Sequence, residues 1–389
     1  MLAFGCLPFV MAAQLSTKVK TMRPTSFLPL VFVITLMSDF ALAQSLGVPG
    51  EYQQNASFLS RRFLTDSTNA AILTADFVYK ADKLYKVRAL FPNGGLLDST
   101  GWLDHAPFAV KAFLDNVSSY EQLNGMSFTL IPYLNGYSPQ DTVHAANLRL
   151  DLENRAVRAR IVTECGRYVS ADVPGSYVAG STRAFDGIAL DLEPAGDPAF
   201  LASLKKLLGE IRASFDGMGL RNKKIGFAAP QYTDRAPKPT WGWNASDYYY
   251  MAKYLNYVIA MTYDSGLQDE SKYQPWMADQ TTHILQAVSG AAWNFDIFHP
   301  RPTNGVRVLV GLPGFYTVTK AHNPDVENVV HGAAGMRDGL SLLALLKDRV
   351  SLGHFQGATM FAHDGGAADS IFARYDKDWA WWRKYWLGQ

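Results

Sequence analysis

A-F-D-G-I-A-L-D-L-E-P, residues 184–194, is the stretch that decides the fold we expect for this chain. Neighbouring side chains of a strand point to opposite faces. One face of this stretch is then wholly apolar, whereas the other carries Asp191 and Glu193. Burying unpaired charge is costly, so two carboxylates on an otherwise apolar strand indicate a function. Pro194 ends the strand, which places Glu193 at the carboxyl end, where catalytic groups of parallel barrels lie.

The segment after this strand has the apolar spacing of a helix. Its large apolar residues recur every three or four positions, at Leu201, Leu204, Leu208, Ile211 and Phe215. A strand, a short loop and an amphipathic helix form the repeating unit of a parallel sheet covered by helices. The alternative is a half-exposed edge strand whose acids face water, since edge strands do carry charges. The helical pattern favours the buried parallel strand.

Strands and helices alternate along most of the remaining chain. We expect strands at 71–79, 85–91, 126–134, 225–229, 257–263, 305–313 and 357–362. We expect helices at 102–123, 147–169, 247–255, 276–292, 339–347 and 370–386. Residues 47–69 are polar and mixed, and we expect them to wrap the outside. The alternation predicts an α/β fold, a (β/α)8 TIM barrel, with a doubly wound sheet as the second choice.

Length and composition set the broad class of the protein. The chain has 389 residues, 48% of them hydrophobic, and a formal net charge of +1, which suits a large core and gives no reason to expect nucleic acid as a partner. The only cysteines are Cys6 and Cys165, so the mature chain has no intrachain disulfide and no cysteine metal site. No repeat or linker marks a second domain, and we expect a monomer.

The N-terminal segment 1–43 has the pattern of a targeting leader. Arg23 precedes an apolar run at 27–37, and Ala41-Leu42-Ala43 forms a small-x-small cleavage site before Gln44. Met22 is a plausible true start. We therefore expect one domain over 44–389, secreted or periplasmic and without stable membrane insertion. An uncleaved membrane anchor is the alternative, although the run is short for a membrane span.

Three predicted strand ends carry polar side chains. Asp191 and Glu193 end one strand, Tyr263 and Asp264 end another, and the pair His363-Asp364 follows the last. The carboxyl ends of parallel strands in a barrel converge on one mouth. Carboxylates beside a phenol suit the cleavage of sugars, because a departing glycosidic oxygen needs a proton from an acid with a raised pKa.

These residues resemble the signature of glycoside hydrolase family 18, the chitinases and endo-N-acetylglucosaminidases. Its F-D-G-x-D-x-D-x-E strand matches here at Phe185, Asp186, Gly187, Asp191 and Glu193, with Ala189 in place of one Asp. A later M-x-Y-D motif matches at Met261, Tyr263 and Asp264. The family also has a strand that ends in G-L-P-x-Y. Residues 311–313 resemble it, although Tyr316 comes one position later than the motif requires. Phe361 takes the place of a tryptophan that forms the floor of the sugar site in that family.

The resemblance implies a role for each matched residue. Glu193 would be the general acid/base, and Asp191 would orient the substrate's 2-acetamido group for attack on the anomeric carbon. Tyr263 would donate a hydrogen bond to that acetamide, and Asp264 would touch the sugar. The reaction would be retaining and substrate-assisted, without an enzyme nucleophile. Because Ala189 removes a like-charged neighbour, we expect the pKa of Asp191 to fall and the activity to be reduced or redirected.

Two tryptophans, Trp241 and Trp243, lie in a proline-containing loop, where they either stack on sugar rings or pack the loop. Histidine spacing predicts no metal, and we expect no cofactor. Asp186 precedes a glycine, so we expect it to have a structural role. The function expected is an exported hydrolase of β-linked N-acetylglucosamine glycans, with an oligosaccharide or polysaccharide as the partner. A catalytically weak, lectin-like relative and a hydrolase for sugars without the acetamide are the alternatives.

Overall fold

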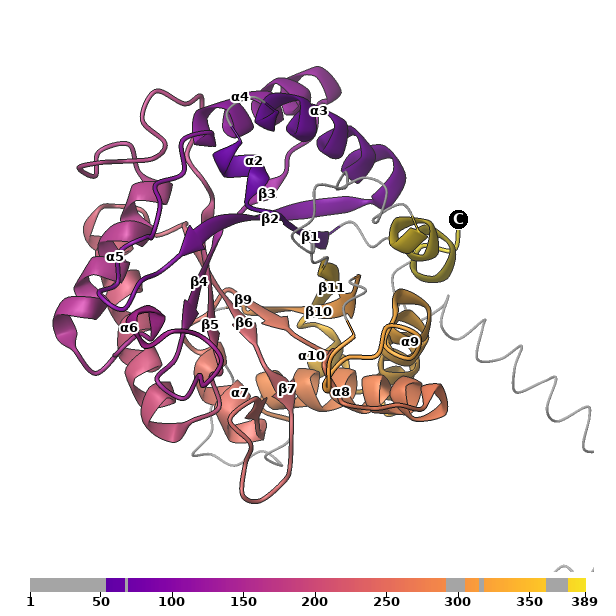
Figure 1. Cartoon of the computed structure of the whole chain (residues 1–389). Coiled ribbons are helices and arrows are strands. Elements are labelled where there is room, and N and C mark those ends of the chain that lie inside the picture. Colours follow the sequence, from indigo (N-terminus) through magenta and orange to yellow (C-terminus); the bar gives the residue numbers. More distant parts are fainter. Residues whose placement is uncertain (1–53, 67–68, 292–304, 315–317, 362–376) are drawn as a thin grey trace, which may run out of the picture.

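The computed structural model describes residues 54–66, 69–291, 305–314, 318–361 and 377–389, in which the sheet closes into a barrel (Figure 1). Strands pair in parallel in the order β1 (Asn55–Leu59), β11 (Phe355–Phe361), β10 (Arg307–Pro313), β9 (Tyr257–Ala260), β6 (Lys224–Ala229), β5 (Gly187–Glu193), β4 (Tyr133–Tyr137), β2 (Val87–Leu96) and β3 (Thr129–Leu130). The ring closes because β1 pairs with both β11 and β2. β3 and β4 pair with successive parts of β2 and share one place, so nine strands make eight positions. The (β/α)8 prediction is confirmed, and the doubly wound sheet was wrong.

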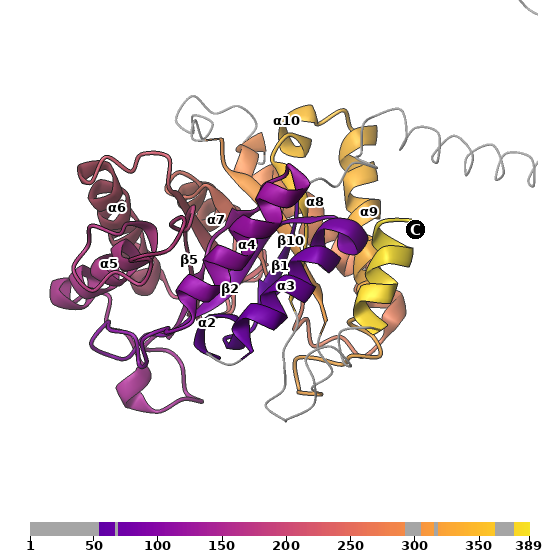
Figure 2. The ribbon, with the colours of Figure 1, turned by 90° about the horizontal axis from the view of Figure 1, so that it is seen from above.

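Helices cover the outside of the barrel (Figures 1 and 2). They are α2 (Arg62–Thr65), α3 (Ala70–Lys80), α4 (Val110–Asn124), α5 (Arg155–Val169), α6 (Pro198–Gly217), α7 (Ala245–Ala252), α8 (Glu270–Ser289), α9 (Val329–Leu345) and α10 (Arg349–Leu352). Helix α6 starts where Asp197 accepts a hydrogen bond from the Phe200 amide and Pro198 takes the first turn. The apolar positions predicted for this helix are all buried: Leu201, Leu204, Leu208, Ile211 and Phe215.

The core has two layers, which follow from the alternation of side chains along each strand. Ile188, Leu190 and Leu192 of β5 belong to the outer layer, between the strands and the helices. Ala189 belongs to a smaller inner cluster, together with Ala56, Phe58, Ala89, Phe91, Ile131, Tyr133, Tyr257, Ile259 and Leu309. The two faces predicted for β5 are therefore confirmed, and its odd positions point into the barrel.

Two N-terminal predictions were wrong. Residues 71–79, predicted as a strand, lie in α3, where Thr74, Phe77 and Val78 are buried while Ile72 is exposed, which is a helical period. Residues 47–69, predicted to wrap the outside, include β1, a strand of the barrel that pairs with both β2 and β11. The five residues of β1 carry no long apolar run, and the Asn55 side chain accepts hydrogen bonds from two distant groups, the Ala358 amide and the Trp386 indole.

Two helices start at other residues than expected, in each case directly after a residue whose side chain caps the helix. The helix expected from 147 starts at Arg155, because Asn154 accepts a hydrogen bond from the Ala156 amide. The helix expected at 339–347 starts ten residues earlier, at Val329, capped by Asn328. Asn135-Gly136 is a pair typical of turns, but it lies inside β4. The glycine is needed there because a Cβ at Gly136 would come within 2.5 Å of the Leu150 side chain.

The C-terminal tryptophans pack the core. Trp379, Trp382 and Trp386 are buried, and Trp379 stacks on Tyr85 at 4.1 Å between ring centroids. The leader at 1–43, Tyr316, the pair at 363–364 and residues 370–376 fall outside the described residues. In the part of the chain that is described, no helix combines the length and apolar character needed to cross a membrane.

Candidate active site

A cavity of about 620 Å³ opens at the carboxyl ends of the strands. Residues at or after the ends of β4, β5, β6, β9 and β10 line it: Val143, Glu193, Pro230, Gln231, Trp241, Met261, Tyr263, Asp264, Thr319 and Ala321. The predicted convergence of the β5 and β9 ends is therefore confirmed for Glu193, Tyr263 and Asp264. A second cavity of about 590 Å³ lies at the opposite end, near the starts of β2, β3, β9 and β11. The first cavity is the candidate site, because two of the predicted acids, Glu193 and Asp264, line it.

Glu193 lies on the inner face of β5 and borders this cavity. Its neighbour on β4 is Tyr137, and Asp191 is paired in the same way with Asn135, one strand repeat deeper. Burial raises the pKa of Glu193 well above its usual range, and the charges of Asp191, Asp264 and Asp141 add to the rise. Such surroundings favour the protonated form of the glutamate, which can give its proton to a bound molecule.

Asp191 lies on the inner face of β5, and one of its carboxylate oxygens accepts no hydrogen bond from the described residues. Burial raises its pKa to about 7, and its buried Oδ1 has no hydrogen-bond partner among the residues that the structure describes. The expectation that the pKa would fall was wrong, because desolvation outweighs the loss of a like charge at Ala189. Ala189 lies beneath, buried in the inner apolar cluster with Tyr133. An unsatisfied buried acceptor is costly, so Asp191 is suited to receive an N–H from a ligand.

Tyr263 is buried beside the acids. Its ring lies over Gly311, where a Cβ would come within 3.1 Å of the ring and 2.6 Å of the Ala260 carbonyl, so glycine leaves the space for the phenol. Burial raises the pKa of Tyr263 far above its usual value, and Asp191, Glu193 and other charges add to the rise. The phenol therefore stays protonated at neutral pH and can act as a hydrogen-bond donor.

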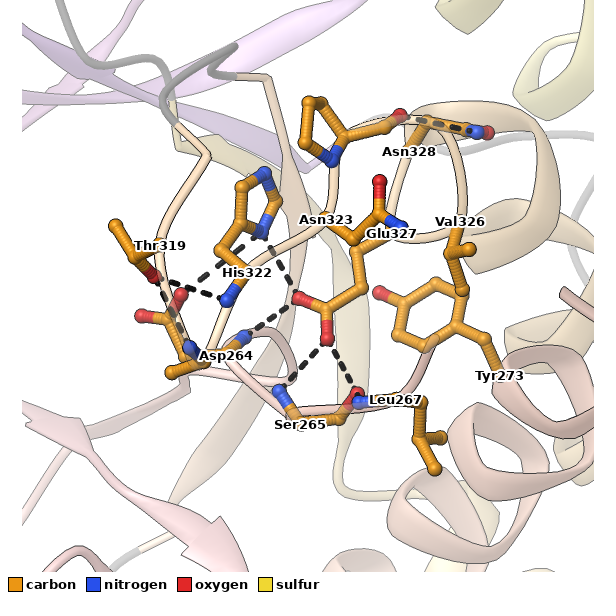
Figure 3. Close-up of polar contacts among 12 residues, drawn as sticks. Asp264, Ser265, Leu267, Tyr273, Thr319, His322, Asn323, Val326, Glu327 and Asn328 are labelled. Atoms are coloured by element: carbon orange, nitrogen blue, oxygen red, sulfur yellow. Dashed lines mark hydrogen bonds and ion pairs between the residues drawn. The ribbon is translucent and has the colours of Figure 1, made fainter. Parts of the chain in front are cut away.

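Asp264 follows at the rim of the cavity, with a backbone φ of 57° and a side chain that is 47% exposed. Burial of its carboxyl group raises the pKa of Asp264 to about 6, while His322 opposes the rise and Glu327 adds to it. The Asp264 amide donates to Glu327 at 2.8 Å (Figure 3). Sequence reasoning found Asp264 but missed Glu327 and His322, which lie about 60 positions away in the loop before α9.

Asp264, His322 and Glu327 can place one potential metal-ligand atom each within 4.8 Å of one another. The carboxylate of Glu327 already accepts hydrogen bonds from the Asp264 and Ser265 amides, the Ser265 hydroxyl and the His322 ring. These donors occupy its lone pairs, and a metal would have to displace them. The group therefore fits a hydrogen-bond network better than a metal centre.

The two loop tryptophans have different environments. Trp241 is 47% exposed and lines the cavity. Trp243 was expected beside it as a substrate-binding residue, but it is fully buried: its ring stacks on Phe227 at 5.3 Å, and its indole N–H donates to the Ala195 carbonyl. The prediction for Trp243 was wrong, because β7 (Gln231–Tyr232) and β8 (Gly242–Trp243) pair and turn that ring into the core. Phe361 ends β11 beside Pro313, and its side chain lies outside the described part.

A further group, missed by sequence reasoning, borders Glu193 after β4. The His144 ring stacks on Tyr137 at 3.6 Å and contacts the Asp141 carboxylate at 2.7 Å. Although burial opposes it, hydrogen bonds from His144 and Val143 lower the pKa of Asp141, which keeps it charged. Asn135-Gly136 is a pair typical of turns, which suggests that the strand ends earlier, and sequence reasoning therefore missed this group.

Asp186, by contrast, has the structural role that was predicted. Its carboxylate accepts hydrogen bonds from the Leu130 amide at 2.8 Å and from Arg183 at 2.6 Å. These contacts tie the start of β5 to β3, away from the cavity.

The sequence matches no protein-family model and no curated protein. Similar solved structures include a GH18 chitinase from Cycas revoluta in complex with (GlcNAc)4, at 13% identity over 86% of this chain and 99% of that chain, with a TM-score of 0.47. The ICChI chitinase from Ipomoea carnea is 14% identical over 84% and 98%, with a TM-score of 0.45. A chitinase from Bacteroides thetaiotaomicron is 12% identical over 80% and 92%, with a TM-score of 0.40. The function proposed below is supported by the residues of the cavity.

Proposed function

We propose that the protein is a glycoside hydrolase that cleaves β-linked N-acetylglucosamine-containing glycans, with Glu193 as general acid/base. The observation that carries the proposal is the pair on β5. Glu193 borders the cavity with a raised pKa, and Asp191 beneath it offers a buried oxygen that has no partner in the described part of the chain. A proton donor above a free acceptor suits a sugar that has both a glycosidic oxygen and an acetamide N–H.

The first step breaks the glycosidic bond. The Glu193 carboxyl transfers its proton to the glycosidic oxygen, and the bond between that oxygen and the anomeric carbon breaks. The substrate's acetamide oxygen forms a bond to the anomeric carbon in place of an enzyme nucleophile. Asp191 accepts the acetamide N–H and balances the positive charge that develops on the ring formed, while Tyr263 donates a hydrogen bond to the acetamide.

The second step uses water. The Glu193 carboxylate takes a proton from a water molecule, whose oxygen bonds to the anomeric carbon as the bond to the acetamide oxygen breaks. Two displacements at one carbon give net retention of configuration, and Glu193 regains the proton that it lost. Asp264 at the rim would contact the sugar in the cleaved subsite.

We place this activity outside the cytoplasm, in a secreted or periplasmic setting, because of the leader pattern at 1–43. The test is N-terminal sequencing of the protein from the culture medium or periplasm. A mature chain starting at Gln44 supports export, whereas an intact leader in the cytoplasm contradicts it.

Cleavage of a chromogenic chitobioside tests the proposed reaction, with Glu193→Gln as the comparison. Release of the chromophore by the native protein alone supports the hydrolase. Oligosaccharide binding by both proteins without cleavage by either contradicts the hydrolase and supports the lectin alternative. Absence of both binding and cleavage contradicts both functions.

Trp241→Ala is expected to raise KM by about 5- to 30-fold, because loss of a stacking platform costs on the order of 1–2 kcal/mol. Trp243→Ala is the matched control from the same loop. It removes a buried ring and is expected to destabilise the fold by about 3–5 kcal/mol. Steady-state kinetics and urea unfolding of both variants check this. An unchanged KM for Trp241→Ala would remove that residue from the binding surface.

Ala189→Asp tests the departure from the family signature. The new carboxylate would lie in the inner apolar cluster below Asp191, so we expect destabilisation of about 3 kcal/mol or more and a further rise in the pKa of Asp191. The pH–rate profile should shift toward higher pH on its acid side. Turnover and its pH profile are measured together with urea unfolding, and an unchanged rate and profile would discard the expected effect of Ala189.

A further inference from the structure

A buried carboxylate from a distant loop accepts hydrogen bonds from the backbone of the segment that carries Asp264. Glu327 is 1% exposed and lies directly before α9. Its Oε2 accepts from the Asp264 amide at 2.8 Å and from the His322 Nδ1 at 2.9 Å. Its Oε1 accepts from the Ser265 amide at 2.8 Å and from the Ser265 hydroxyl (Figure 3). One carboxylate therefore holds two successive backbone N–H groups.

The backbone conformation of Asp264 explains why these hydrogen bonds to Glu327 are needed. A φ of 57° is left-handed and costs a residue with a side chain on the order of 1 kcal/mol or more. Two consecutive amides that converge on one anion compensate for this cost, as in backbone anion nests. Removal of the carboxylate would leave buried donors unpaired and free the segment to return to an ordinary conformation.

We propose that Glu327, supported by His322, is a positioning residue that holds Asp264 and Tyr263 in their working places at the cavity. The inference rests on the proposed function, since it assigns Glu327 a purpose in that reaction. Glu327 itself does not line the cavity, so it acts through the groups it holds and does not touch the substrate.

The same network also fixes a wall of the cavity. Thr319 and Ala321 belong to the loop that carries His322, and both line the same cavity as Glu193. The Gly266 amide donates to the Ala321 carbonyl at 2.8 Å, which joins the loop after β9 to the loop before α9. Movement of Glu327 would therefore displace Asp264 and this wall together. An error of about 1 Å in such a group is enough to cost on the order of 100-fold in rate.

Glu327→Gln is the first test, because glutamine keeps the shape but presents an N–H where one carboxylate oxygen accepted. We expect kcat/KM on the chitobioside to fall by about 10- to 100-fold, with kcat reduced, in protein that is fully folded at the assay temperature. Glu270→Gln is the matched control: Glu270 starts α8 and its side chain is 70% exposed. We expect its constants to stay within about twofold of the native values.

His322 provides a graded second test. His322→Ala removes the ring donor, whereas His322→Asn keeps an N–H close to the position of Nδ1. We expect the Asn variant to recover most of the rate lost in the Ala variant. Equal losses in both variants, scaling with their unfolding midpoints, would indicate a merely structural role and overturn the proposal.

The crystal structure of Glu327→Gln gives a result that does not depend on activity. We expect Asp264 to leave its positive φ and its carboxylate to move from the rim. An unchanged segment overturns the inference, whatever the assay gives. Loss of cleavage and of oligosaccharide binding in the native protein itself would instead overturn the proposed function, so the two failures are distinguishable.

Discussion

Glu193→Gln is expected to lower kcat on a chromogenic chitobioside by about 10³- to 10⁴-fold, which corresponds to about 4–5.5 kcal/mol of transition-state stabilisation. Glutamine cannot release a proton to the departing oxygen, and the other carboxyl group among the described residues lining the cavity, Asp264, lies after β9 at the rim. Binding of an N-acetylglucosamine oligomer should change by less than about threefold, because the amide occupies the same volume. Steady-state kinetics and calorimetry measure the two effects separately.

Glu153→Gln is the control for this variant, because Glu153 is exposed and does not line the cavity. It should match the native protein in both rate and affinity. A Glu193→Gln protein that turns over the substrate at more than about a tenth of the native rate would contradict the role of general acid. The same variant should also be more stable at neutral pH, since it removes a carboxyl group whose ionisation is disfavoured by burial.

Asp191→Asn is expected to lower kcat by about 10²- to 10³-fold. Asparagine can still accept a hydrogen bond through its amide oxygen, but it has no negative charge to balance the ring that forms from the acetamide. KM should change little if Asp191 acts mainly in the transition state. Equal falls in kcat and kcat/KM are therefore the expected signature, and a rise in KM alone would assign Asp191 to ground-state binding.

The pH dependence of Asp191→Asn is a second, independent readout. Burial raises the pKa of Asp191 to about 7 and that of Glu193 well above its usual range, so the native profile should be bell-shaped, with both limbs set by these two acids. The acid limb corresponds to protonation of Asp191, and the alkaline limb to loss of the Glu193 proton. Asp191→Asn should lose the acid limb near pH 7. A limb that persists unchanged would assign it to another group.

The stability of the same variant follows from the sign of the shift. The folded pKa of Asp191 lies above its unfolded value of 3.8, so the folded state binds more protons between about pH 4 and pH 7. Stability of the native protein therefore falls as pH rises through this window. Asp191→Asn avoids that loss, and its advantage in urea unfolding should be larger at pH 8 than at pH 4. The reverse order would contradict a raised pKa.

Much of the candidate site was predictable from local sequence. The alternation in 184–194 places Asp191 and Glu193 on one face of a strand whatever surrounds it, because side-chain direction in a strand has a period of two. The prediction that the ends of β5 and β9 converge needed only the repeated strand and helix pattern, since parallel barrels bring their carboxyl ends to one mouth.

Other features could not be predicted, because they depend on contacts between distant segments. The region containing Phe77 combines β-branched and aromatic residues, and only burial against its neighbours selects a helix. β1 is held by pairing with β2 and β11, and its short sequence carries no comparable signal. Trp241 and Trp243 have similar sequence contexts, yet the pairing of β7 with β8 sends one into the core and leaves the other at the cavity.

The sequence by itself determined the strand with its two acids, the period of the helices around it and therefore the barrel, because these depend on spacing along one segment. Only the tertiary structure decided which groups set the properties of that site. The pKa of Asp191 is raised by burial, a property of everything packed around it, and Glu327 reaches Asp264 across 63 positions of chain. Desolvation and long-range hydrogen bonds arise only when distant segments meet, so no local pattern specifies them.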